Sequence, residues 1–362
     1  MNENIQFRLF SSLVIIIFLS TTSRAVTIST VPVGGPGNAP DSATGYGAVP
    51  YAYRIGTFDV TYSQYAEFLN EKAATADPYG LWNSSLDAGS SVSHVNDGGI
   101  VRSVAAGTMT YSYSARSGYA FKPVIYVSWY DAVRFVNWLT NGQGNGDTES
   151  GTYTITNGGS NSGIVTIPDV SLRANWAAGR ALHWLLPSED EWYKAAYFNG
   201  TAGTYYVYPF QSNRPPIPLA PPGNANSGNF SNVSAGPPPA FNYDGQGSYL
   251  TSVGAYSDSQ SPFGSFDMGG DVFQWDEALI GSNRGQRGGY WNYPTGFARS
   301  TLRFSDAPTI ESYGVGFRVA SVGIVPEPAT IVMAVIGFVG SFIFRNRGLA
   351  IPHRHLSQDA RR

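Results

Sequence analysis

The chain has 362 residues, of which 13% are charged, and its formal net charge is -3. It contains no cysteine, which excludes disulfides, thiolate metal sites and cysteine nucleophiles. The slightly acidic balance, without a basic stripe, argues against a nucleic-acid partner, because phosphate binding needs clustered Lys and Arg.

Residues 1–25 have the pattern of a secretory signal peptide. An apolar run, 9–19, follows Arg8, and a small-x-small cleavage site ends at Ala25. The pattern predicts an exported protein whose mature chain starts at Val26.

Three helices are predicted from capping boxes, in which a hydroxyl residue and an acid or amide three positions later satisfy each other's backbone amides. Each box precedes apolar residues at helical spacing. The pairs are Thr61 with Gln64, Ser128 with Asp131, and Ser188 with Glu191.

Short strands and long loops are predicted for the rest of the chain. Residues 153–155 and 164–167 are predicted to form a hairpin on either side of an Asn/Gly/Ser-rich loop, 156–163. The proline-rich stretch 214–240 is predicted to be irregular. We therefore expect one α+β domain over about residues 27–322.

Five segments, in this order, resemble the formylglycine-generating-enzyme family, also called the sulfatase-modifying-factor domain. They are Tyr53-Arg54-Ile55-Gly56-Thr57-Phe58-Asp59-Val60-Thr61; Lys122-Pro123-Val124 with Val127-Ser128-Trp129-Tyr130-Asp131-Ala132; Leu186-Pro187-Ser188-Glu189-Asp190-Glu191-Trp192; Phe266-Asp267-Met268-Gly269-Gly270-Asp271-Val272-Phe273-Gln274-Trp275; and Arg287-Gly288-Gly289-Tyr290-Trp291 with Gly316-Phe317-Arg318-Val319-Ala320. The resemblance implies a compact α+β fold with little regular secondary structure, related to the C-type lectin fold.

The C-terminal region resembles the PEP-CTERM sorting signal. Pro326, Glu327 and Pro328 precede an apolar stretch, 329–344, which ends before Arg345 and Arg347. The resemblance implies a sorting signal over 325–348, a membrane segment at 329–344, cleavage by an exosortase, and release to the cell surface or extracellular matrix. The remaining tail, 349–362, is longer than such signals usually have, which leaves a plain membrane anchor as the alternative.

The family resemblance also bears on redox metals. In the active enzymes, two cysteines between the Arg-Gly-Gly and Gly-Phe-Arg segments bind copper and support oxidation of a sulfatase cysteine. Ser, Thr and Tyr cannot replace a soft ligand of Cu(I), so no copper is expected here. Iron-dependent members use three histidines, but His353 and His355 lie in the tail. His94 and His183 leave a two-His-one-carboxylate site open, beside the simpler interpretation of a solvated and a packed histidine.

Calcium is the metal that the resemblance favours. Carried over from the family, one site would use the Asp267 side chain, the carbonyls of Gly270 and Val272, and the Gln274 side chain. Gln274 stands where the family has Glu, and Asp271 where it has Asn. A second, fainter site would involve Asn229 and Asp244. Calcium prefers such oxygen ligands.

Other catalytic patterns are weak. Glu189, Asp190 and Glu191 could be paired carboxylates for glycoside cleavage, but at a helix start the helix dipole and the cap explain three acids. The tyrosines in predicted loops either stack on a ligand or pack within the loops; they are Tyr205, Tyr206, Tyr208, Tyr243 and Tyr249.

Two main functions compete. The first is a non-catalytic surface or matrix protein that binds a glycan, a peptide or a matrix protein. By analogy with ligand binding on the related fold, its contact residues would be Tyr290, Trp291, Tyr293, Phe297, Arg299 and Arg303. The second is an oxidoreductase of this family that uses a different metal, or none, on a protein or small thiol. A weaker third is an accessory subunit that presents a substrate to an active paralogue.

Overall fold

The computed structural model describes residues 25–87, 98–232 and 248–324. These ranges form strands and short helices, which confirms the predicted α+β class. Within them, no helix combines the length and the apolar character needed to cross a bilayer. Several predicted features lie outside the described residues: positions 1–24 of the signal peptide, His94, Tyr243, Asp244, the sorting motif Pro326-Glu327-Pro328, and the segments 329–344 and 349–362.

Two four-stranded sheets form the centre of the fold. The first is antiparallel, in the order β1 (Thr30–Val33), β2 (Tyr53–Gly56), β16 (Ala320–Val322) and β7 (His183–Leu185). The second runs β14 (Phe304–Asp306), β13 (Asn283–Arg287), β12 (Phe273–Ile280) and β15 (Val315–Phe317), with only the last pair parallel. The end of the domain therefore pairs with its beginning, because β16 lies against β2.

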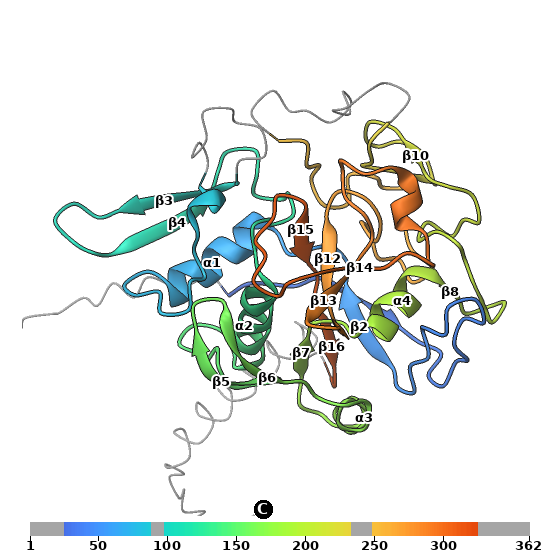
Figure 1. Ribbon diagram of the computed structural model, residues 1–362, viewed down its shortest axis with the longest axis horizontal. Coiled ribbons are helices and arrows are strands. Elements are labelled where there is room, and N and C mark those ends of the chain that lie inside the picture. The colour runs from blue at the N-terminus through green and yellow to red at the C-terminus, as the bar shows by residue number, and fades with distance from the viewer. Residues whose placement is uncertain (1–24, 88–97, 233–247, 325–362) are drawn as a thin grey trace, which may run out of the picture.

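The helices lie on both sides of these sheets. They are α1 (Tyr62–Lys72), α2 (Trp129–Thr140), α3 (Val170–Ala178) and α4 (Glu189–Tyr197), with 3-10 turns η1 (Ser84–Leu86) and η2 (Thr295–Ala298). Figure 1 shows α1 and α2 on one side of the central strands and α4 on the other. Aromatic rings join α1 and α2 to β15: Phe135 contacts Phe68 and Phe317, with ring centroids 5.4 Å apart in each case.

The remaining strands of the described residues form two-stranded ribbons. They are β3 (Ile100–Val104) with β4 (Tyr111–Ala115), β5 (Thr154–Gly159) with β6 (Ser162–Thr166), β8 (Phe198–Asn199) with β9 (Thr204–Tyr205), and β10 (Ile217–Pro218) with β11 (Ser227–Gly228). The β3–β4 hairpin projects from the side that carries α1 (Figure 1). Apart from β10 and β11, the described part of the proline-rich stretch, 214–232, has no strand or helix, as predicted.

The three predicted capping boxes are all present. Thr61, Ser128 and Ser188 each accept a bond from the backbone of the third helical residue, whose side chain bonds back. The predicted hairpin is also confirmed as β5 and β6. Its loop is shorter than expected, because backbone pairing continues into the Asn/Gly/Ser-rich stretch and leaves a turn at residues 160–161.

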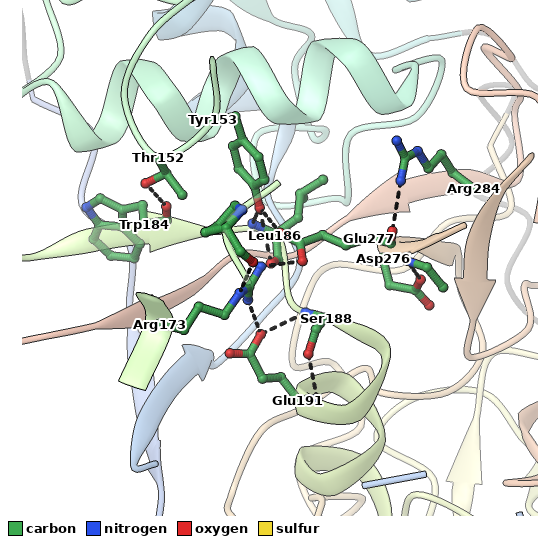
Figure 2. Close-up of polar contacts among 12 residues, drawn as sticks. Thr152, Tyr153, Arg173, Trp184, Leu186, Ser188, Glu191, Asp276, Glu277 and Arg284 are labelled. Carbon is green, nitrogen blue, oxygen red and sulfur yellow. Dashed lines mark hydrogen bonds and ion pairs between the residues drawn. The ribbon is translucent and has the colours of Figure 1, made fainter. Parts of the chain in front are cut away.

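Helix α3 was not predicted from the sequence, and Arg173 is its one fully buried side chain. Arg173 lies between Glu191 at the start of α4, at 2.7 Å, and Glu277 of β12 (Figure 2). Glu277 also accepts a bond from the Tyr153 hydroxyl. Burial raises the pKa of Glu277, and the nearby Glu191 carboxylate raises it further, while Arg173 lowers it. The ion pairs of Arg173 thus anchor α3, together with the partly buried apolar side chains Ala174, Trp176 and Ala177.

Replacing Arg173 by Ala is expected to lower the free energy of unfolding by about 3–5 kcal/mol, because two buried carboxylates lose their cation. The matched control is Arg180→Ala, at an exposed position, which should cost less than about 0.5 kcal/mol. Urea denaturation of both variants tests this. Equal effects of the two substitutions would contradict the role given to Arg173.

Candidate functional site

Three of the five motif segments meet at the buried Arg318 side chain, and a fourth joins them through Trp192, which donates to Gln274. Its guanidinium donates to the Gln274 side chain (2.6 Å), the Gly56 carbonyl (2.9 Å), the Ser265 hydroxyl (2.9 Å), and the carbonyls of Phe266 and Asp267 (3.0 Å each). Its charge is balanced by Asp59 at 2.9 Å, and both side chains are fully buried. The remaining motif segment packs beside this junction, because a Cβ at Gly316 would lie 2.5 Å from the Val124 carbonyl oxygen.

The Gln274 side chain, a predicted calcium ligand, is part of this junction. Its oxygen accepts from the Trp192 indole at 2.7 Å as well as from Arg318, and its amide donates to the Asp267 carbonyl at 2.6 Å. The Gly270 carbonyl accepts from the Val272 amide at 2.8 Å. A cation bound by the Gln274 oxygen would have to displace two hydrogen bonds.

The two aspartates of this loop have separate partners. The Asp267 carboxylate accepts from the Gly254 amide at 2.7 Å, whereas Asp271 accepts from the Asn229 side chain at 2.6 Å and the Thr251 amide at 3.1 Å. Burial raises the pKa of Asp267 to about 6 and that of Asp271 to about 7.

As arranged, Asp267, the Gly270 carbonyl and Gln274, which are three of the predicted ligands, each bond to other groups of the protein. Asn229 meets Asp271 rather than Asp267, and the part of the chain that the structure describes holds no cluster of three His, Cys, Asp or Glu suited to a metal ion. Calcium at this loop therefore stays a prediction that requires rearrangement of Gln274.

The predicted contact residues form a packed aromatic group and two arginines. Tyr290 and Trp291 are buried, with 8% and 4% of their surface exposed, while Tyr293 and Phe297 are half-buried. Tyr293 links the group, because its ring centroid lies 4.6 Å from that of Tyr290 and 4.4 Å from that of Phe297. Trp291 stacks on Tyr249 at 4.5 Å.

The two arginines differ in exposure and in contacts. Arg299 is exposed. Arg303 pairs with Glu189 at 2.5 Å, lies over the Tyr46 ring, and keeps about a third of its side chain exposed. The half-buried rings Tyr293 and Phe297 and these two arginines are thus the members of the predicted surface that solvent reaches.

The three acids at the start of α4 have structural partners. Glu189 pairs with Arg287 at 2.6 Å as well as with Arg303, and Asp190 accepts from the Gly47 amide at 2.8 Å. Glu191 closes the capping box and binds Arg173. These contacts support the interpretation of the acids as cap and ion-pair residues.

The remaining candidates are packed against protein. His183 stacks on Trp176 with ring centroids 4.1 Å apart, and burial lowers its pKa. The Tyr205 hydroxyl donates to the Ala39 carbonyl at 2.8 Å, and Tyr206 accepts from Asn199. Tyr208 and Tyr249 are buried. Packing within the loops therefore accounts for the described tyrosines of this group.

The fold and the motif junction define a cysteine-free chain of the sulfatase-modifying-factor type. The chain belongs to the sulfatase-modifying-factor family, because the model of the Sulfatase-modifying factor enzyme 1-like domain matches residues 41–322. No curated protein matches the chain in sequence.

Several solved structures are similar to the chain, among them the following three. CarF is 18% identical, with a TM-score of 0.48 over 83% of this chain and 99% of its own. Treponema denticola variable protein 1 is 17% identical, with a TM-score of 0.44 over 83% and 96%. PvdO from Pseudomonas aeruginosa is 18% identical, with a TM-score of 0.41 over 82% and 92%. Identities this low do not transfer an activity.

Stability should depend on pH through Asp271. Its pKa of about 7 in the folded chain exceeds the unfolded value of about 3.9, so the folded state holds the proton more tightly. In EDTA, the free energy of unfolding should therefore fall between about pH 4 and pH 7, by on the order of 3 kcal/mol from this group. Asp271→Asn should flatten that slope in urea titrations.

The same pH titration, repeated with added calcium, tests whether the loop 267–274 binds the cation. If the loop binds calcium, the cation favours the carboxylate form, and calcium chloride should remove the slope and raise the melting temperature. A curve unchanged by calcium would contradict the predicted site. An unchanged slope in Asp271→Asn would contradict the assignment of the titration to Asp271.

Proposed function

We propose that this protein is a non-catalytic ligand-binding scaffold built on the sulfatase-modifying-factor fold. The observation that carries the proposal is the segment between Arg287 and Arg318. Active members of the family have two cysteines there, whereas this chain has none and fills the region with contacting aromatic rings. Without thiolates, the copper chemistry of the active enzymes has no ligands.

The proposal includes export to the cell surface or extracellular matrix. The signal-peptide pattern of residues 1–25 and the sorting motif Pro326-Glu327-Pro328 support it. In this proposal the segment 329–344 holds the precursor in the inner membrane until an exosortase cleaves the tail. Calcium, if it binds the loop 267–274, has a structural role.

The proposed ligand is a surface glycan or a matrix protein, bound at the accessible part of the predicted surface. Tyr293 and Phe297 present partly exposed rings, and Arg299 and Arg303 add positive charge beside them. Such rings combined with arginine are enriched where proteins bind other molecules. The buried Tyr290 packs against Tyr293, and Trp291 packs against Tyr290.

The double substitution Tyr293→Ala and Arg303→Ala is expected to abolish capture of the ligand without unfolding the domain. The assay is retention of the purified chain on immobilised matrix polysaccharide and matrix protein from the producing cells, with melting temperature as the check on folding. Ile164→Ala, at an exposed position on β6, is the matched control. Unchanged retention of the double variant would rule out this surface.

The proposed lack of cysteine-oxidising activity is tested with a peptide substrate. The purified chain, loaded with copper or iron, should leave a sulfatase-derived cysteine peptide unchanged in oxygenated buffer, as read by mass spectrometry. Elemental analysis of the chain purified without chelator accompanies the assay. Formation of formylglycine, or stoichiometric copper or iron, would overturn the proposal in favour of an oxidoreductase with a different metal site.

A further inference from the structure

A cavity of about 790 Å³ lies between the N-terminal segment 25–29, the first two turns of α1, and the loops around Phe58, Phe121 and Val253. None of the predicted metal or contact residues lines it. Its volume is within the range of small-molecule sites, about 300–1,000 Å³. The cavity is therefore a second candidate binding site, separate from the surface at Tyr293 and Arg303.

The N-terminal wall of the cavity is tied down by side-chain bonds. The Gln143 side chain bonds both backbone groups of Val26. It accepts from the Val26 amide at 2.6 Å and donates to the Val26 carbonyl at 2.8 Å. Gln64 of α1 donates to the Thr27 carbonyl at 3.0 Å, and the Ser29 hydroxyl lies 2.9 Å from that of Thr57. Because these bonds hold the wall, the cavity is formed before any ligand arrives.

The lining disfavours anionic ligands. Among the described residues that line the cavity there is no lysine, arginine or histidine. Its acids are Glu67 on α1 and Asp59, whose carboxylate is fully buried and paired with Arg318. The Asp59 charge is already balanced by Arg318. The ammonium group of a mature chain that starts at Val26, which also lines the cavity, offsets the charge of Glu67, so an anion finds no unpaired cation here. The cavity therefore suits an uncharged ligand.

The other polar groups are neutral and can both donate and accept. They are the side chains of Thr27, Ser29, Thr61, Ser63, Gln64 and Ser252. A hydroxyl group has one donor and two acceptor positions. Those of Thr61 are taken up by Ser63 and Gln64, whereas the Ser29 hydroxyl, with its single bond to Thr57, keeps capacity for a ligand. This set matches a ligand whose own groups are hydroxyls.

Phe121 provides an apolar face beside these hydroxyl groups. Its side chain lines the cavity and is 68% exposed. Phe58, which also lines the cavity, stacks on Phe266 with ring centroids 5.5 Å apart, so the inner wall is backed by the core. A flat aromatic face next to neutral hydroxyl and amide groups complements a sugar ring, which has an apolar face of C–H groups and a rim of hydroxyls.

We propose that this cavity binds a neutral carbohydrate, with a pyranose ring stacked on Phe121 and its hydroxyls bonded to the serine, threonine and glutamine side chains. The site does not require the surface at Tyr293 and Arg303 to bind anything. It is a carbohydrate site of its own, apart from the surface proposed above for a glycan or a matrix protein.

The test is saturation-transfer NMR on the full chain with maltose, cellobiose, lactose and diacetylchitobiose, and with digalacturonic acid as the anionic probe. At least one neutral disaccharide should receive saturation on its ring protons. Phe121→Ala should raise the dissociation constant about tenfold, as loss of one stacking contact implies. Ser252→Trp, at an exposed cavity position, should block binding.

Leu279→Ala is the matched control, since Leu279 is 65% exposed and lies outside the cavity. It should leave binding unchanged, as should the Tyr293→Ala and Arg303→Ala double variant. Loss of binding in that double variant would place the sugar on the other surface and overturn the proposal. Failure of every neutral disaccharide to bind, unchanged binding in Phe121→Ala, or tighter binding of digalacturonic acid would also overturn it.

Discussion

The burial of one charged group, the Arg318 guanidinium, constrains the rest of the structure. A fully buried cation is stable only when it is paired and its N–H groups are bonded. Here Asp59 supplies the negative charge, and Gln274 and backbone carbonyls accept the hydrogen bonds. These partners come from residues 56–59 near the start of the domain and from residues 265–274 near its end, so the guanidinium is satisfied only when both segments are in place.

This constraint explains why an amide at position 274 suits the junction. A carboxylate could accept from Arg318 and Trp192, but it could not donate to the Asp267 carbonyl as the Gln274 amide does. The Gln274 amide therefore bonds the start of the loop, at the Asp267 carbonyl, and also bonds Arg318 and Trp192 outside the loop. The same bonds compete with a cation for that oxygen, so internal cross-linking and calcium binding are alternative uses of this loop.

The buried ion pairs adjoin the candidate binding regions, because Asp59 lines the cavity and Glu189 pairs with both Arg287 and Arg303. Arg173, Arg287 and Arg318 each hold carboxylates from distant elements and contribute to stability. The cavity beside Phe121 and the accessible edge at Arg303 instead retain polar groups that solvent reaches.

The sequence by itself determined the features that depend on neighbouring residues. The caps at Thr61, Ser128 and Ser188 and the β5–β6 hairpin were predictable because their bonds span a few positions. The motif order was also enough to indicate the family. Only the tertiary structure decided that α3 forms, because its anchor Arg173 binds residues far along the chain. It likewise decided which way Gln274 points and how deeply Tyr290 is buried, since side-chain orientation depends on partners that local spacing does not specify.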